Sequence, residues 1–114
     1  MEDVDFSDEF CRFLQANVPT VEAAELLLLL YRSPEPVVSD PASAKLLQTF
    51  QSAGLAAAEG HAVRYRPATP QLEGHVRTLA KAYEERPVTL IRIIYALRDG
   101  KIRSFADAFK LRKG

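Results

Sequence analysis

The stretch Val21–Arg32 decides the fold of this chain, and it reads VEAAELLLLLYR, with five consecutive leucines from Leu26 to Leu30. Five consecutive leucines surround a helix at about 3.6 residues per turn, so they predict a helix with protein on most of its circumference. Thr20 is a suitable N-cap, and Ser33-Pro34 ends the helix because the residue before proline disfavours helical backbone. We therefore expect this leucine helix to form the centre of the core, nearly fully buried.

Length and composition indicate one domain spanning residues 1–114. A chain of this length with 47% hydrophobic and 26% charged residues can bury a single core. One cysteine excludes an internal disulfide, and Met1 is followed by acidic residues where a signal peptide has basic ones, so we expect a cytoplasmic protein. No membrane partner is predicted, because the apolar run is shorter than the about 20 residues that cross a bilayer.

The charge sums to zero but is distributed unevenly along the chain. Residues 1–40 carry nine acids against Arg12 and Arg32, a net charge of −7, whereas residues 86–114 carry eight bases against Asp99 and Asp107, a net charge of +6. The basic end can be an arm for nucleic acid, or the two ends can neutralise each other within the molecule or across a dimer. The sequence leaves these alternatives open.

A helix with two separate faces is predicted after the extended, proline-containing connection 34–38. Asp40-Pro41 has the composition of a helix start, and Gly54 that of a helix end. The positions expected to turn inward are Ala44, Leu46, Leu47, Phe50 and Ala53. The exposed stripe is expected to consist of Lys45, Gln48, Thr49 and Ser52.

After Gly54 the hydrophobic pattern changes from helical to alternating. Residues 55–58 and 61–66 flank Glu59-Gly60, which is typical of a tight hairpin turn with Gly60 at positive φ. The face expected to pack consists of His61, Val63 and Tyr65. The opposite face consists of Ala62, Arg64 and Arg66. The pattern predicts one two-stranded β-hairpin.

Two successive segments, LLQTFQSAGL at 46–55 and EGHAVRYRP at 59–67, carry a resemblance to a known family. They are similar to the winged-helix domains of bacterial transcription regulators of the MarR and ArsR kinds, in which a recognition helix enters the major groove and a hairpin forms the wing. The resemblance implies a mainly α (α+β) fold, with a winged-helix-like core at 7–67 and a helical extension at 69–114. The DNA-binding residues that it implies are Lys45, Gln48, Thr49, Ser52, Arg64 and Arg66, whose side chains suit base edges and phosphates.

The resemblance is incomplete, because a helix-turn-helix needs a positioning helix and only Glu35–Ser39 lies between the leucine helix and Asp40. Two functions are therefore considered. The first is a homodimeric, DNA-binding transcription regulator; the second is a winged-helix protein-interaction module that has lost sequence-specific DNA reading. The sequence contains no catalytic constellation, phosphate loop or metal-ligand spacing, so we expect neither an enzyme nor a cofactor.

The C-terminal extension is predicted to be helical. Thr69-Pro70 opens one helix, the apolar segment 88–97 forms a second, and Ser104 caps a third in the basic tail from Lys101 to Lys113. Segment 88–97 either fills its own core or pairs with its counterpart in a homodimer, which the resemblance favours. The dimer interface would then consist of Leu90, Ile91, Ile94 and Leu97.

The tail also contains Phe105 and Phe109, four residues apart. Apolar side chains at this spacing lie on one side of a helix, so they predict that the tail docks on a protein surface. The C-terminal helices are therefore the expected contact region for a protein partner.

Overall fold

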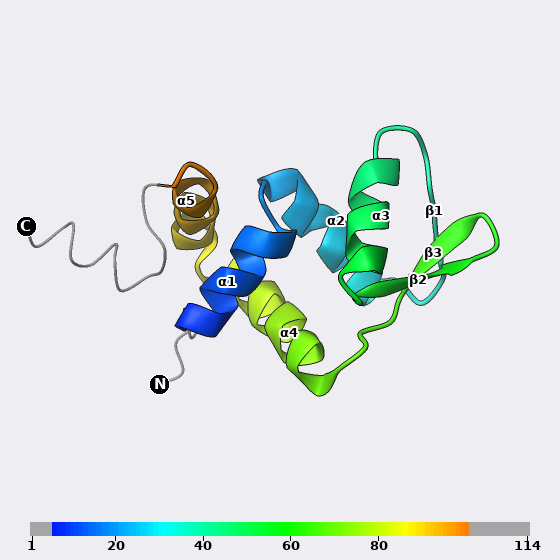
Figure 1. The fold of residues 1–114 in the computed structure, drawn as a ribbon. Coiled ribbons are helices and arrows are strands. Elements are labelled where there is room, and N and C mark those ends of the chain that lie inside the picture. The colour runs from blue at the N-terminus through cyan, green and yellow to red at the C-terminus, as the bar shows by residue number, and fades with distance from the viewer. Residues whose placement is uncertain (1–5, 101–114) are drawn as a thin grey trace, which may run out of the picture.

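The computed structural model describes residues 6–100 and has a mainly helical α+β fold with a small antiparallel sheet (Figure 1). This confirms the predicted fold class. The helices are α1 (Asp8–Asn17), α2 (Val21–Arg32), α3 (Ala44–Ser52), α4 (Pro70–Glu85) and α5 (Pro87–Arg98). The strands are β1 (Val37–Val38), β2 (Ala56–Glu59) and β3 (Ala62–Tyr65). The predicted helix after Ser104 and the basic tail lie outside the described residues.

The predicted hairpin is present, but it belongs to a three-stranded sheet. The strand order is β1-β3-β2 and both pairings are antiparallel, with Val37 opposite Val63 on one side and Ala58 opposite Val63 on the other. Gly60 has a φ of +64°, as the predicted turn requires. The expectation of a two-stranded hairpin was incomplete, because two valines after a proline-containing connection are too short a run to show strand alternation.

The leucine helix, α2, lies at the centre of the molecule, between α4 on one side and α3 on the other (Figure 1). The Thr20 hydroxyl accepts a hydrogen bond from the Ala23 N–H at 3.1 Å, so Thr20 is the predicted N-cap. Leu27, Leu28 and Leu30 are at most 2% exposed. Leu26 is half-buried, and Leu29 is 53% exposed, so the expected near-complete burial was wrong for Leu29.

Helix α5 packs into the core of its own chain. Leu90, Ile94 and Leu97 are at most 1% exposed, because Pro87 starts a new helix directly after α4 and turns it against α4 and α1. The Gln15 side-chain amide also donates to the Leu97 carbonyl at 3.2 Å. The dimer interface predicted through Leu90, Ile91, Ile94 and Leu97 is therefore corrected: three of these side chains are covered within one chain, and Ile91 is half-buried.

The same substitution at two glycines should have opposite effects on stability. Gly54 ends α3 with a φ of +81°, and an added Cβ would lie 3.3 Å from the Ala68 Cβ, so we expect Gly54→Ala to destabilise the fold by about 1–2 kcal/mol. Gly74 lies inside α4 with no atom within 4 Å of an added Cβ, so Gly74→Ala should stabilise it by up to about 1 kcal/mol. Chemical denaturation measures the change in the free energy of unfolding for both variants. Changes of the same sign would contradict the assigned helix end at Gly54.

Candidate nucleic-acid interface

Helix α3 presents its polar stripe outward because its apolar residues anchor it from below. Leu47 and Phe50 are 0% exposed and pack in the core. The side chains on the opposite side are all exposed, as predicted: Lys45, Gln48, Thr49 and Ser52. The Thr49 hydroxyl donates to the Lys45 carbonyl at 3.0 Å, so its methyl group and the acceptor side of its oxygen remain for contact with a ligand.

The start of α3 is held by a turn rather than by the predicted helix cap. The Asp40 carboxylate accepts hydrogen bonds from the backbone N–H and the hydroxyl of Ser43, both at 2.9 Å, and these bonds lower the pKa of Asp40. The helix therefore begins at Ala44, later than predicted, and Ala44 is exposed instead of turned inward. Between α2 and α3 the chain forms only β1 and this turn, in the place where a helix-turn-helix has its positioning helix.

The packed face of the hairpin is fixed to α2 and α4. Val63 is 4% exposed, and the Tyr65 ring meets the Tyr31 ring edge-on with 5.3 Å between centroids. The Tyr65 hydroxyl donates to the Glu73 carboxylate at 3.2 Å, and partial burial together with this carboxylate raises the pKa of Tyr65. His61 was expected on this face but is exposed, because it lies in the turn just before β3 begins.

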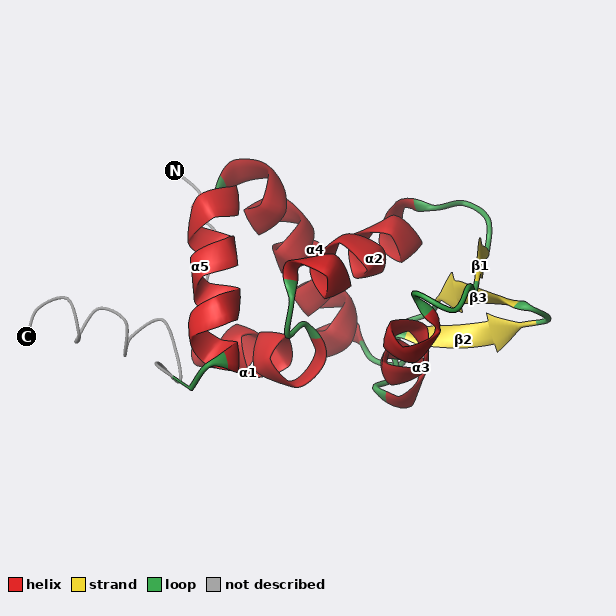
Figure 2. Ribbon diagram, turned by 90° about the horizontal axis from the view of Figure 1, so that it is seen from above, coloured by secondary structure: helices red, strands yellow, loops and turns green. Residues whose placement is uncertain are grey.

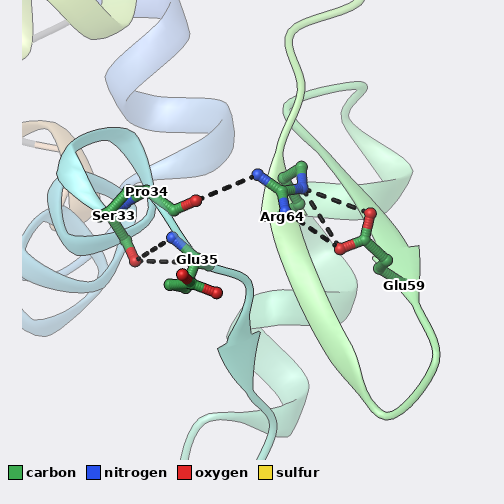
Figure 3. A network of polar contacts seen from close by, with 5 residues as sticks. All are labelled: Ser33, Pro34, Glu35, Glu59 and Arg64. Carbon is green, nitrogen blue, oxygen red and sulfur yellow. Dashed lines mark hydrogen bonds and ion pairs between the residues drawn. The ribbon is translucent and has the colours of Figure 1, made fainter.

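Arg64 is tied to its surroundings rather than free (Figure 3). Its guanidinium donates to the Glu59 carboxylate from Nε at 3.3 Å and from Nη2 at 3.2 Å, and from Nη1 to the Pro34 carbonyl at 3.4 Å. The sequence reasoning missed Glu59, although a tight turn at Glu59-Gly60 makes residues 59 and 64 diagonal neighbours on one face of the hairpin. The pair is exposed, so Glu59 partly neutralises the positive charge of Arg64 but leaves its guanidinium accessible to solvent.

Arg66 follows directly after β3 and is exposed. No side chain among residues 6–100 forms a hydrogen bond or an ion pair with its guanidinium. Of the two hairpin arginines, Arg66 is therefore the one ready to meet a phosphate, whereas Arg64 must first exchange the Glu59 carboxylate.

The charge of this region is not that of a strongly basic surface. Residues 20–67 contain five acids, Glu22, Glu25, Glu35, Asp40 and Glu59, and four bases, Arg32, Lys45, Arg64 and Arg66, for a net charge of −1. Phosphate contacts supply most of the affinity of non-specific DNA binding. Any DNA binding by this face must therefore depend on a few local contacts, and because the log–log salt slope scales with the number of phosphates contacted, we expect its affinity to fall only shallowly with added salt.

A cleft of about 370 Å³ lies next to the start of α3. Its lining comes from α2, from the Asp40 turn and from α3: Glu22, Leu26, Asp40, Ala42, Ser43 and Leu46. A second cleft, of about 250 Å³, lies between α1 and α4 and includes His75, whose ring stacks on Phe13 at 5.1 Å. This stacking makes His75 half-buried.

Comparisons of the chain with known protein families, with curated proteins and with solved structures found no match. Within residues 6–100, no three His, Cys, Asp or Glu side chains are grouped so that they could hold a metal ion. In the same range no single helix has the length and apolarity to span a membrane, although α1 and α2 taken together, with a bend of 99° between them, pass that test. The geometry of α3 and the hairpin is therefore the basis for the proposed function.

Proposed function

We propose that this protein is a cytoplasmic, winged-helix DNA-binding transcription regulator of the bacterial kind. Helix α3 would enter the major groove as the recognition helix, and the hairpin β2–β3 would be the wing. The observation that carries the proposal is the arrangement of α3, which is held to the core by Leu47 and Phe50 while its whole polar stripe faces outward. The order along the chain, with the leucine helix, then α3, then the hairpin, supports it.

The residue types divide the work between base edges and phosphates. Gln48 can pair with an adenine edge, and the Thr49 methyl group can contact a thymine methyl. Lys45 can donate to guanine, and Ser52, one turn after Gln48, can donate to a base or a phosphate. Arg66, and Arg64 once it leaves Glu59, would each neutralise about one phosphate.

The outer face of α5 is an exposed surface that suits a protein partner. Val88 is 62% exposed and Tyr95 is 38% exposed, and with the half-buried Ile91 they lie along one side of the helix. This face does not involve the core residues Leu90, Ile94 and Leu97. A homodimer remains part of the proposal because two copies of α3 could then meet two half-sites of one operator.

A protein-interaction module is the second candidate function, and two observations favour it. The Arg64 guanidinium is already hydrogen-bonded to the Glu59 carboxylate, and residues 20–67 carry a net charge of −1. A face of this kind suits a protein partner with mixed charge better than it suits a polyanion.

Removing the Glu59 carboxylate separates the two candidates. If the hairpin is a wing, Glu59→Gln frees Arg64, so binding to duplex DNA should tighten and the log–log salt slope should steepen by about one phosphate contact. Glu35→Gln is the matched control, since it removes the same charge nearby but leaves the pair of Glu59 and Arg64 intact. Fluorescence anisotropy across a salt series measures both variants, and equal effects of the two would contradict a direct role of Arg64.

Replacing Gln48 tests base reading by α3. We expect Gln48→Ala to cost about 1–3 kcal/mol on the preferred site and little on random DNA, because only a matched base edge rewards that side chain. Gln51→Ala is the control, because Gln51 has the same side chain in the same helix but lies off the exposed stripe and is half-buried. Equal losses for both variants, or none for Gln48→Ala, would remove α3 from the interface.

A further inference from the structure

The leucine helix has one side that the described residues leave uncovered. Glu22, Leu26 and Leu29 are spaced i, i+4 and i+7, so they follow one side of α2. Leu29 is 53% exposed and Leu26 is half-buried. The solvent-facing side of a helix normally carries polar residues. An apolar strip along such a side is typical of a contact surface.

The same strip leads into the cleft of about 370 Å³ beside α3. Leu26 from α2 and Leu46 from α3 line that cleft together with Ala42, and both leucines also pack against the core from their other side. The cleft and Leu29 thus form one apolar groove, which we call the α2–α3 groove. It occupies the place where the turn at residues 40–43 replaces a positioning helix.

The two charged residues in the lining of the groove are acidic. Glu22 and Asp40 both contribute to the cleft, and the hydrogen bonds from Ser43 lower the pKa of Asp40, so its carboxylate stays ionised at neutral pH. The occupant that fits a groove with an apolar floor and acidic residues at its edge is a polypeptide segment with spaced apolar side chains and basic neighbours.

The chain itself contains one such segment, residues 101–114. Its apolar side chains include Phe105 and Phe109, four residues apart, and its charged residues are five bases and one acid: Lys101, Arg103, Lys110, Arg112, Lys113 and Asp107. We propose that the C-terminal segment of one protomer binds in the α2–α3 groove of a second copy, and that the second copy returns the same contact.

The position of α5 favours exchange between two copies over docking within one chain. Helix α5 ends next to α1, where the Gln15 amide reaches the Leu97 carbonyl at 3.2 Å, and α5 and the α3–hairpin region lie toward opposite ends of the molecule (Figures 1 and 2). Phe105 is five residues beyond Gly100 and can therefore lie at most about 17 Å from it. A partner protomer in a two-fold arrangement removes this limit and makes both contacts at once.

The exchange would add positive charge beside the α3 surface. Each occupied groove would bring five bases against one acid beside a region of net charge −1. The contact rests on the homodimer of the proposed function but not on DNA binding, so it can be tested without DNA.

Complementation between two full-length variants provides that test. Phe105→Ala with Phe109→Ala removes the apolar contacts of the tail, and Leu29→Glu places a charge in the groove at a position already 53% exposed. By sedimentation at micromolar concentration we expect the wild type to be a dimer and each variant alone to be a monomer. An equimolar mixture should form a heterodimer, because the intact tail of the groove variant can enter the intact groove of the tail variant.

Val88→Glu is the matched control for Leu29→Glu, since it places the same charge on another exposed apolar residue outside the groove, and this variant should remain a dimer. In the wild type, the methyl NMR signals of Leu26, Leu29 and Leu46 should shift with protein concentration, whereas those of the buried Leu79 should not. A monomeric wild type, a dimer that survives the double phenylalanine change, or a mixture that does not associate would each overturn the exchange. Methyl shifts that are lost in the tail variant but independent of concentration would place the tail in its own groove and overturn it as well.

Discussion

Ile94→Glu should unfold the protein rather than dissociate a dimer. Ile94 is 1% exposed and lies in the core between α5 and its neighbours, so a carboxylate there would be buried without a described partner. Such a change costs about 4 kcal/mol or more, which is comparable to the total stability of many small domains, about 5–15 kcal/mol. Denaturant unfolding followed by circular dichroism measures the loss.

Val88→Glu provides the comparison on the same helix. Val88 is 62% exposed in the first turn of α5, where an acidic side chain is favoured by the helix dipole, so its stability should change by no more than about 0.5 kcal/mol. If Ile94→Glu stayed folded with nearly wild-type stability and changed only the oligomeric state, the packing of α5 in its own core would be wrong. The dimer interface predicted through Leu90, Ile91, Ile94 and Leu97 would then be correct.

Adjacent leucines in α2 should respond differently to the same truncation. Leu28 is 2% exposed, so Leu28→Ala should cost about 2–5 kcal/mol through lost burial and the cavity left behind. Leu29 is 53% exposed, so Leu29→Ala should cost less than about 1 kcal/mol in the monomer. Unfolding curves at a protein concentration low enough to exclude assembly give both values. Similar losses at the two positions would mean that the structure orients α2 incorrectly.

Local sequence signals predicted the helices well, because the atoms that start a helix are close together in sequence. Thr20 and Thr69 were the expected helix starts, and each side chain accepts a hydrogen bond from an N–H three residues later, at 3.1 Å in both cases. Gly54 and Gly60 likewise take the positive φ values that their turns require. The exposed stripe of α3 followed from helical periodicity in the same way.

Features that depend on contacts far apart in sequence were not predictable. Strand β1 is defined by its pairing with β3 about 25 residues later, not by its own two valines. Helix α5 is apolar on more than one face, a pattern that fits both a core helix and a dimer helix, and only the packing against α1 and α4 decides between them. Five leucines in a row indicate that α2 is surrounded, but their order cannot show that the side with Leu29 lacks a cover within residues 6–100.

The candidate site was likewise predictable only where it depends on local sequence. The sequence identified the residue types on α3 and on the hairpin, but it did not show that Glu59 holds Arg64 while Arg66 remains exposed. It also did not reveal the α2–α3 groove, because Glu22, Leu26 and Leu46 come together only in three dimensions.

Binding of the wild-type chain to duplex DNA across a salt series, beside the variant that carries both Arg64→Ala and Arg66→Ala, is the decisive measurement for the proposed function. If α3 and the hairpin form the interface, the wild type should prefer particular sequences, and the double variant should bind all duplexes more weakly with a log–log salt slope reduced by about two. Binding without sequence preference, with the same salt slope in both proteins, would contradict DNA recognition by α3 and the hairpin.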